Sequence, residues 1–180
     1  MKEARLSSAR QLFVRRWGEM AATWGVPRTM AEIHALLYLA TKPLSTDDIM
    51  EELAVSRGSA STNIRQLVNW GLIHRVHQRN DRKEYFEAEK DVWQMFETIM
   101  RERRRREVQP IVETIERCIT MIDEGGESSG AGKKEVEAYK KRFTDILEFC
   151  NVMNTLFNMM SRVGHAKLEP MVKMLEKYTG

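Results

Sequence analysis

The chain has 180 residues, of which 42% are hydrophobic and 31% are charged, and its formal net charge is +3. A chain of this length can bury a core of its own, and the composition is typical of a soluble, mainly helical protein. No apolar run is long enough to cross a membrane, and the first residues lack the apolar block of a signal peptide, so we expect a cytoplasmic protein. The two cysteines, Cys118 and Cys150, lie far apart, which indicates buried thiols rather than a disulfide or a zinc site.

The first predicted element is a helix within residues 1–25 that carries an aromatic stripe. Its apolar positions recur at helical spacing and are Leu6, Phe13, Trp17, Met20 and Trp24. Gly25 and Pro27 then end the helix. A stripe this apolar needs a partner surface, and we expect the helix to pack on a dimerisation region formed by the C-terminal helices or by a second subunit.

A DNA-binding domain is predicted over residues 26–90. Thr29 and Glu32 have the spacing of a capping box and would begin the first helix of this domain. Pro43 would end that helix. Its predicted buried face consists of Ile33, Leu36, Leu37 and Ala40.

The centre of this domain is a second helix that follows a short one after a tight turn. Ser45 and Asp48 form another capping box for the short helix, and Ser56 caps the helix of residues 57–70. At 100° per residue, one arc of that helix is apolar and consists of Ala60, Ile64, Leu67 and Val68. The opposite arc and its flanks are polar and consist of Ser59, Thr62, Asn63, Arg65, Gln66 and Asn69. Such side chains can approach and pair with base edges in a major groove, which predicts a recognition helix.

Two short strands are predicted after this helix, over residues 72–78 and 84–88, because these segments are rich in β-branched and aromatic residues. The turn between them carries three cations, Arg79, Arg82 and Lys83. A hairpin of this kind beside a recognition helix is the wing of a winged helix-turn-helix. Its cations would contact the minor groove or the phosphates.

Positive charge is concentrated in this part of the chain. Residues 57–83 hold six arginine and lysine side chains against one acid, so the local charge is 6 − 1 = +5. This charge favours double-stranded DNA as the partner. The residues that we predict to contact DNA are Ser56, Arg57, Ser59, Thr62, Asn63, Arg65, Gln66, Arg79, Arg82 and Lys83.

Residues 91–180 are predicted to form a helical dimerisation region. Pro110 should kink or break its first long helix, and the glycine- and serine-rich residues 124–132 form a flexible linker. Five arginines within residues 101–106 favour a solvated helix face over a contact with flanking DNA.

The helix expected after the linker is apolar most of the way round. One of its stripes consists of Val136, Tyr139, Phe143, Ile146, Cys150, Met153, Phe157 and Met160, and a second consists of Phe149, Val152, Leu156, Met159 and Val163. A helix of this kind is buried, most simply between two subunits. A last short helix is predicted over residues 168–178.

Several segments of the chain resemble a known family of regulators. The chain resembles the winged-helix core of MarR-type regulators in three segments, which are Leu44-Ser45 through Ile49, Ser56-Arg57-Gly58-Ser59-Ala60-Ser61 and Trp70-Gly71-Leu72-Ile73. It resembles the GbsR-like branch of that family in four further segments, which are Arg82-Lys83-Glu84-Tyr85-Phe86-Glu87-Ala88-Glu89, Asp91-Val92-Trp93, the Trp17-Gly18 helix and Gly25-Val26-Pro27-Arg28. The resemblance covers most of residues 1–117.

The resemblance implies a homodimeric transcriptional regulator, usually a repressor, that reads a near-palindromic operator and sometimes releases it on binding a small molecule. Members of this branch control glycine betaine or choline genes. Many MarR-type wings carry Asp-x-Arg, whereas here Asp81 is followed directly by Arg82 and Lys83, which leaves open which cation enters the groove.

Two other functions can be weighed against DNA binding. In a small-molecule sensor, Trp17, Trp24, Tyr38, Trp93 and Phe96 would line a cleft for a quaternary ammonium such as choline or glycine betaine, although aromatic residues on apolar stripes more often form a core. An enzyme is disfavoured, because the chain carries no nucleophile elbow, no zinc-protease motif and no dinucleotide loop. Its four histidines are scattered, and we expect no cofactor and no metal.

Overall fold

The computed structural model describes residues 2–79, 81–124 and 132–163, which fall into two compact units, Met1–Ile99 and Met100–Gly180. Most of the predicted linker, residues 125–131, and the helix predicted over residues 168–178 lie outside the described residues. Each of the two units has its own helices and its own buried side chains.

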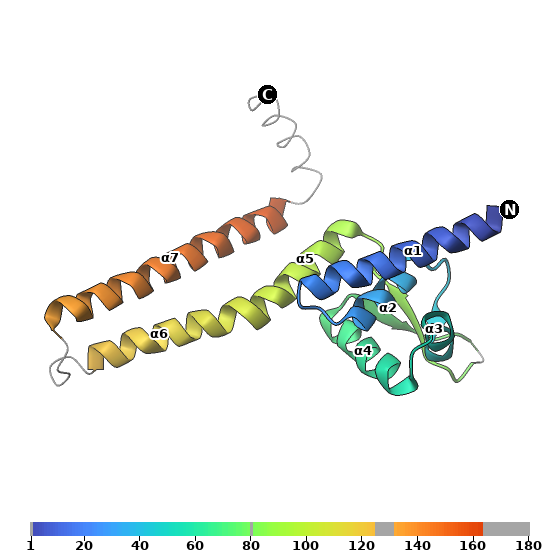
Figure 1. The fold of residues 1–180 in the computed structure, drawn as a ribbon, viewed down its shortest axis with the longest axis horizontal. Helices are drawn as coiled ribbons and strands as arrows, with labels where there is room; N and C mark the ends of the chain where they lie inside the picture. Colours follow the sequence, from blue (N-terminus) through green and yellow to red (C-terminus); the bar gives the residue numbers. More distant parts are fainter. Residues whose placement is uncertain (1, 80, 125–131, 164–180) are drawn as a thin grey trace, which may run out of the picture. The chain divides into compact units, whose positions relative to one another are not determined.

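The first unit is mainly helical with a small antiparallel sheet (Figure 1). Its elements are α1 (Lys2–Thr23), α2 (Arg28–Leu39), β1 (Leu44–Ser45), α3 (Thr46–Leu53), α4 (Arg57–Trp70), β2 (Ile73–Val76), β3 (Tyr85–Ala88) and the greater part of α5 (Val92–Arg103). The strand order is β1-β3-β2, with Leu44 opposite Phe86 and Val76 opposite Tyr85. This is a winged helix-turn-helix, as the sequence predicts.

Helix α2 lies at the centre of the core of this unit. It packs against α1, α3, α4 and β3, and most of its residues are buried. Helix α4 presents its apolar arc to the same core, and β2 and β3 close it with Ile73 and Phe86. The core residues that are almost completely buried include Met30, Ile33, Leu36, Leu37, Ile49, Leu67, Ile73 and Phe86.

The start of α2 differs from the prediction. The N-cap residue is Pro27 and no side chain caps the helix, so the capping box expected at Thr29 and Glu32 is wrong. The reason is that the helix already begins at Arg28, which places Thr29 inside its first turn. The Glu32 carboxylate instead accepts a hydrogen bond from Arg28 Nε at 2.7 Å. The second capping box is confirmed, since Ser45 and Asp48 bond reciprocally at the start of α3.

Helix α1 packs on α2 with a face that the aromatic stripe only partly overlaps. The buried residues of α1 are Val14, Gly18 and Ala21, whereas Leu6 and Trp24 are 74% and 58% exposed. At about 100° per residue, this buried face is rotated by roughly a quarter turn from the centre of the predicted stripe. Small side chains are what allow the close approach, because a Cβ on Gly18 would stand 2.6 Å from Glu32 Cγ. The predicted packing of α1 on a dimerisation region stays a prediction, which now concerns only its exposed side.

The second unit is a helical hairpin. A π-helical segment, η1 (Arg104–Val108), precedes α6 (Gln109–Glu124), and α7 (Lys133–Val163) runs back beside α6 (Figure 1). Pro110 lacks the backbone N–H that a regular helix would use, and the wider turns of η1 come directly before it. The chain stays helical through Gln109, so the predicted break does not occur there, and the irregularity takes the form of this π-helical segment.

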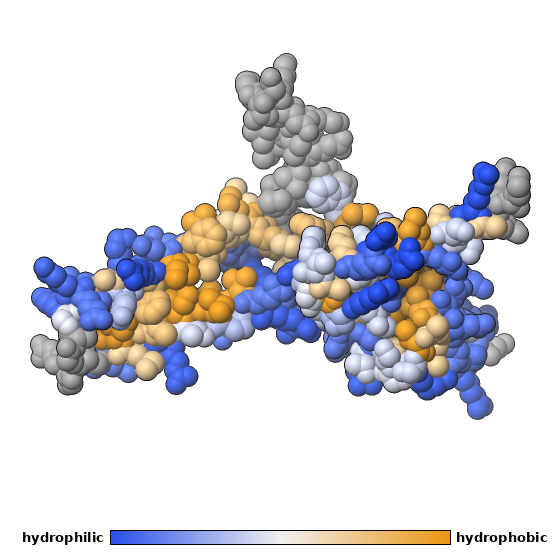
Figure 2. Space-filling view, viewed as in Figure 1, coloured by the Kyte–Doolittle hydropathy of each residue, from blue (hydrophilic) through white to orange (hydrophobic). Residues whose placement is uncertain are grey.

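The faces of α7 divide into one that packs on α6 and one that does not. Phe143, Leu147, Cys150 and Phe157 recur at helical spacing and are half-buried. Phe149 is 65% exposed and Leu156 is 49% exposed, and Figure 2 shows apolar surface along this hairpin. The single hairpin therefore buries only one side of α7, and the burial predicted for the other side requires another surface.

Candidate DNA-binding surface

Helix α4 has a buried arc and a polar arc, as its sequence predicts. Ser56 begins the helix, and its Oγ accepts a hydrogen bond from the backbone N–H of Ser59 at 3.3 Å. Gly71 ends it with φ of 78°, in the left-handed region that favours glycine. The buried side chains are Ala60, Ile64, Leu67 and Trp70, and Val68 is half-buried. The helix is thus held by the core along one side and open to a partner along the other.

The polar arc of α4 holds every residue that the sequence places at base edges. Thr62 and Arg65 are exposed, and Ser59, Asn63 and Gln66 are half-buried. Asn63 is turned back on its own helix, because its Nδ2 donates to the carbonyl oxygen of Ser59 at 2.9 Å. Thr62, Arg65 and Gln66 are therefore the better candidates for contacts with bases.

The wing is ordered by Asp81. Its carboxylate accepts a hydrogen bond from the backbone N–H of Lys83 at 2.9 Å and one from the Tyr85 hydroxyl at 2.7 Å. The Lys83 backbone bond, followed by the Tyr85 bond, lowers the pKa of Asp81, and the same acid raises the pKa of Tyr85. Asp81 thus shapes the turn through a backbone group and a tyrosine of β3, which is how this wing is organised without an Asp-x-Arg pair.

The cations of this surface differ in whether an acid already holds them. Arg57 and Lys83 both lie against Asp47 of α3, at 2.6 Å and 3.4 Å from its carboxylate oxygens. By contrast, Arg65, Arg79 and Arg82 are exposed and form no ion pair within the described residues. These three guanidinium groups can bind phosphates or bases without first giving up an acidic partner.

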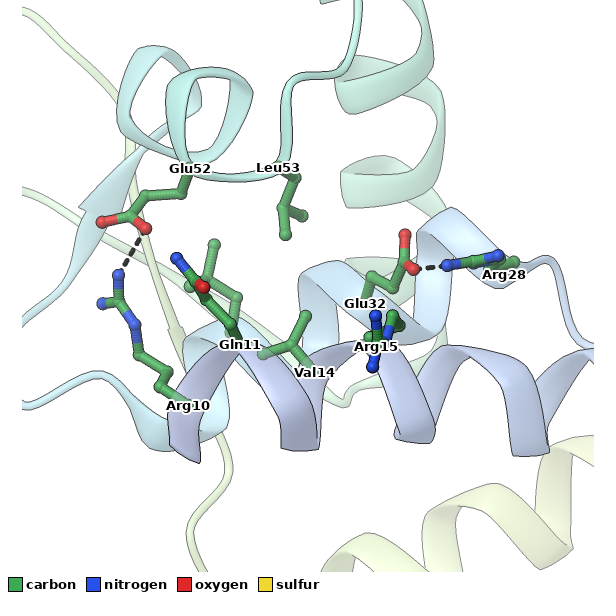
Figure 3. Close-up of a pocket in the computed structure, with 9 residues that line it drawn as sticks. Arg10, Gln11, Val14, Arg15, Arg28, Glu32, Glu52 and Leu53 are labelled. Atoms are coloured by element: carbon green, nitrogen blue, oxygen red, sulfur yellow. Dashed lines mark hydrogen bonds and ion pairs between the residues drawn. The ribbon is translucent and has the colours of Figure 1, made fainter. Parts of the chain in front are cut away.

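A groove beside α2 is lined by both basic and acidic side chains (Figure 3). It has a volume of about 230 Å³ and lies between α1, α2 and α3. Arg10 pairs with Glu52, which joins α1 to α3, and Arg28 pairs with Glu32 within α2. The Arg10–Glu52 pair therefore connects the N-terminal helix to α3, the helix that precedes α4.

The five aromatic residues predicted to bind a ligand do not form one site. Trp17 and Tyr38 line a cavity of about 140 Å³, together with Phe13, His34, Ala35, Val92 and Met95. Trp24, Trp93 and Phe96 are 58%, 46% and 41% exposed and do not line it. The cavity therefore contains only two of the five predicted residues.

The sequence prediction did not include His34, which lines this cavity, or Lys90, whose Nζ lies 5.8 Å from the centre of the Tyr38 ring. His34 is 3% exposed, and its Nε2 has no hydrogen-bond partner. Burial, and then the nearby charge of Lys90, lowers the pKa of His34 to about 4. Lys90 Nζ donates to the carbonyl oxygens of Leu37, Tyr38 and Ala40 at 2.8, 2.8 and 3.0 Å, at the C-terminal end of α2. The position of His34 between Ile33 and Ala35 on a buried face was the one signal in the sequence.

The arginine run of residues 101–106 is engaged within its own helices. Glu102 is buried and pairs with Arg105 and Arg106, and Arg103 pairs with Glu107. Arg104 donates to Asn154 of α7. These contacts agree with a paired helix face rather than a DNA contact.

In the part of the chain that the structure describes, no helix is long and apolar enough to cross a membrane. Within the same residues, no group of three His, Cys, Asp or Glu side chains could hold a metal ion.

Part of this unit is similar in sequence to known proteins. Residues 24–84 match the model of the MarR family. The chain is 29% identical over 113 residues to the HTH-type transcriptional repressor GbsR of Bacillus subtilis (strain 168), covering 63% of this chain and 62% of that protein. It is 24% identical over 94 residues to the putative HTH-type transcriptional regulator YvaV of the same organism, covering 52% of this chain and 53% of that protein. The chain thus spans less than two thirds of the length of these relatives.

A solved structure shows the same fold. The crystal structure of a transcriptional regulator matches 86% of this chain and 99% of its own, with a TM-score of 0.54 and 22% sequence identity. The observed helix-turn-helix and wing are consistent with the family match and with the similarity to GbsR. Residues 24–84 are therefore similar to the MarR family in sequence, and they fold as a winged helix-turn-helix.

Proposed function

We propose that the protein is a sequence-specific regulator of transcription that binds double-stranded DNA, acting as a dimeric repressor at a near-palindromic operator. The observation that carries this proposal is the pairing of two elements on one unit. Helix α4 presents Thr62, Arg65 and Gln66 outward, and the wing beside it presents Arg79 and Arg82, which no acid neutralises within the described residues. The names of the relatives, a repressor and a putative regulator, support the same function.

The chemistry of DNA assigns different roles to the two elements. Thr62 and Gln66 lie on the outward arc, where a helix in the major groove meets base edges, and glutamine pairs with adenine through two hydrogen bonds. Arg65 lies beside them and suits guanine in the same way. Arg79 and Arg82 lie on the wing, where they would neutralise phosphates or enter a narrow minor groove. The helix therefore selects the sequence, and the wing supplies affinity.

A second copy of the chain is the partner proposed for the helical hairpin. The outer side of α7 exposes Phe149, Val152, Met153, Leu156 and Met159, each about half or more accessible. Apolar surface of this extent on a helix favours burial in a helical interface. Two subunits would then place two α4 helices on successive turns of DNA, about 34 Å apart.

Binding of fluorescent duplexes to purified protein tests this function. Arg82→Ala should weaken binding to all sequences by about three- to tenfold and reduce the salt dependence, because one phosphate contact is lost. Gln66→Ala and Thr62→Ala should instead reduce discrimination at particular base pairs. Exposed Lys134, on the helical hairpin, offers a matched control, and Lys134→Ala should leave binding unchanged.

Two results would contradict the proposal. One is binding whose strength barely changes between 50 and 200 mM salt, since phosphate neutralisation must release counterions. The other is an unchanged base preference in both α4 variants, which would remove α4 as the reading element.

A second candidate function, release of DNA by a small molecule, is favoured by the cavity at His34. Its walls are apolar, and among the described lining residues His34 Nε2 is the one buried side-chain nitrogen or oxygen without a hydrogen-bond partner. Lys90 Nζ already lies 5.8 Å from the centre of the Tyr38 ring, and its charge disfavours a second cation there. We therefore propose an uncharged, apolar effector with one hydrogen-bonding group in place of choline or glycine betaine. Trp17 fluorescence should respond to such a compound in the wild type and not in Ala35→Phe, which fills the cavity.

A further inference from the structure

The two sides of the proposed DNA-binding surface are joined by a single acidic side chain. Asp47 is in the first turn of α3, and its Oδ1 lies 2.6 Å from Nη2 of Arg57, the first residue of α4. Its other oxygen, Oδ2, lies 3.4 Å from Nζ of Lys83 on the wing. One carboxylate thus contacts two cations from two different DNA-facing elements.

These contacts are made at the surface and not in the core. The side chains of Asp47, Arg57 and Lys83 are 47%, 69% and 57% exposed. Exposed ion pairs contribute little to folding, so stability alone does not account for an acid placed between two cations. The bond from Arg57, and then that from Lys83, lowers the pKa of Asp47, so this acid is ionised at neutral pH.

We propose that Asp47 is an intramolecular competitor of DNA phosphate, which holds Arg57 and Lys83 and thereby sets the sequence-independent part of DNA affinity. This inference rests on the proposed function in DNA binding. A carboxylate and a phosphate offer the same acceptor chemistry to a guanidinium or an ammonium group. Each cation must leave Asp47, or share it, before it can neutralise a phosphate, and the negative charge of Asp47 itself opposes the approach of DNA.

Asp47 should affect the affinity for DNA and leave the discrimination between base pairs unchanged. Arg65, Thr62 and Gln66 make no contact with Asp47 that the structure records, and the unpaired Arg79 and Arg82 retain their charge. Weak phosphate binding lets a regulator leave the large excess of non-operator sites. Asp47 would therefore limit retention on random DNA.

Asp47→Asn is the direct test, because it keeps the shape of the side chain and removes its charge. We expect this variant to bind both operator and random duplex about three- to tenfold more tightly at 50 mM salt, since two cations are released. The slope of log K against log salt should become steeper by about 0.9 for each cation that then binds a phosphate. A structural role would not change this slope, and thermal unfolding of the variant checks that the fold is kept.

Glu51→Gln is the matched control. Glu51 lies one turn further along α3, is exposed and has no ion-pair partner within the described residues, so this variant changes the net charge equally without releasing Arg57 or Lys83. It should change affinity and salt slope less than Asp47→Asn does. A second check is that Lys83→Ala should cost less DNA affinity in the wild type than in Asp47→Asn, because Asp47 already holds Lys83 in the wild type.

The outcomes separate this inference from the function on which it rests. Wild-type protein that fails to bind any duplex would overturn the proposed function. Wild-type protein that binds with a normal salt slope, together with an Asp47→Asn variant equal to wild type or to Glu51→Gln, would overturn the competitor alone. Weaker binding by Asp47→Asn would also overturn it, and would show that Asp47 aligns the two cations for DNA.

Discussion

The two units of this protein differ in how completely they bury their apolar side chains. In the winged-helix unit, α2 is surrounded by α1, α3, α4 and the sheet, and its Ile33, Leu36 and Leu37 are nearly inaccessible. In the hairpin, α6 and α7 cover each other on one side only, and residues as large as Phe149 and Leu156 stay exposed. The first unit can be stable as a single copy, whereas the second has surface that calls for a partner.

The largest predicted effect concerns the outer side of α7. Replacing both Phe149 and Leu156 with glutamate should abolish dimer formation at micromolar concentration, because two charges would have to be buried in an apolar interface. We expect a loss of association of at least about a hundredfold, and light scattering during gel filtration measures it.

The control for this prediction is Asn151→Glu, which adds a charge on roughly the opposite side of the same helix. This variant should remain a dimer. A double glutamate variant that stays dimeric would show that the subunits associate through another surface. The exposed side of α7 would then not be the surface that needs a partner.

The next effect in size is the acid sensitivity of the closed core. Because burial lowers the pKa of His34 from 6.5 to about 4, the unfolded chain binds a proton at pH values where the folded protein does not. The stability that neutral His34 contributes is complete above pH 6.5 and is lost as the pH falls toward 4. Between pH 7 and pH 4.5 this loss is about 2 kcal/mol.

Urea unfolding at both pH values measures this loss. His34→Leu should lose about 2 kcal/mol less than the wild type over this range, while the exposed His77→Gln should behave as the wild type does. Equal acid sensitivity in all three proteins would mean that His34 is hydrated in the folded state and that the core is less closed than its burial suggests.

A smaller effect is expected where α4 ends. Gly71 has a φ of 78°, a conformation that costs other residues energy, so Gly71→Ala should destabilise the winged-helix unit by about 1 kcal/mol. Gly58, in the first turn of α4 and without such a φ, is the control, and Gly58→Ala should be neutral or slightly stabilising. Chemical denaturation compares the two, and an equal effect at both sites would contradict this account of Gly71.

The smallest effect is expected at the turn between α3 and α4. Ala54 has a φ of 51° and ends α3 in the left-handed region. Ala54→Gly relieves about 1 kcal/mol of strain and loses most of it to the greater freedom of glycine in the unfolded chain. A gain of a few tenths of a kcal/mol in unfolding free energy is therefore expected, and a loss of more than about 0.5 kcal/mol would show that the Ala54 methyl group packs usefully.

How much the sequence could predict also differs between local and long-range features. The Ser45–Asp48 capping box, the cap at Ser56 and the buried arc of α4 depend on residues a few positions apart, and all were predicted. The strand β1 was missed, because two residues carry no periodic pattern and are defined only by pairing with β3. The face of α1 was misplaced for a related reason, since Gly18 packs by being small and contributes nothing to an apolar stripe.

The candidate site shows the same division. Periodicity predicted which residues of α4 face outward, but the contact of Asp47 with both Arg57 and Lys83 joins residues separated by 10 and 36 positions. The three hydrogen bonds that Lys90 Nζ donates to carbonyl oxygens at the C-terminal end of α2 are likewise long-range contacts, and no local sequence pattern predicts them. Contacts of this kind are set by tertiary packing and become visible only in the folded chain.

We propose that the winged-helix unit reads DNA while the helical hairpin pairs two such units. Selection of bound duplexes from a random pool by the full-length protein tests both parts together. We expect enrichment of an inverted repeat whose half-site centres lie about 10 base pairs apart, or a multiple of that distance. Enrichment of a single unpaired half-site, or no enriched sequence at all, would contradict it.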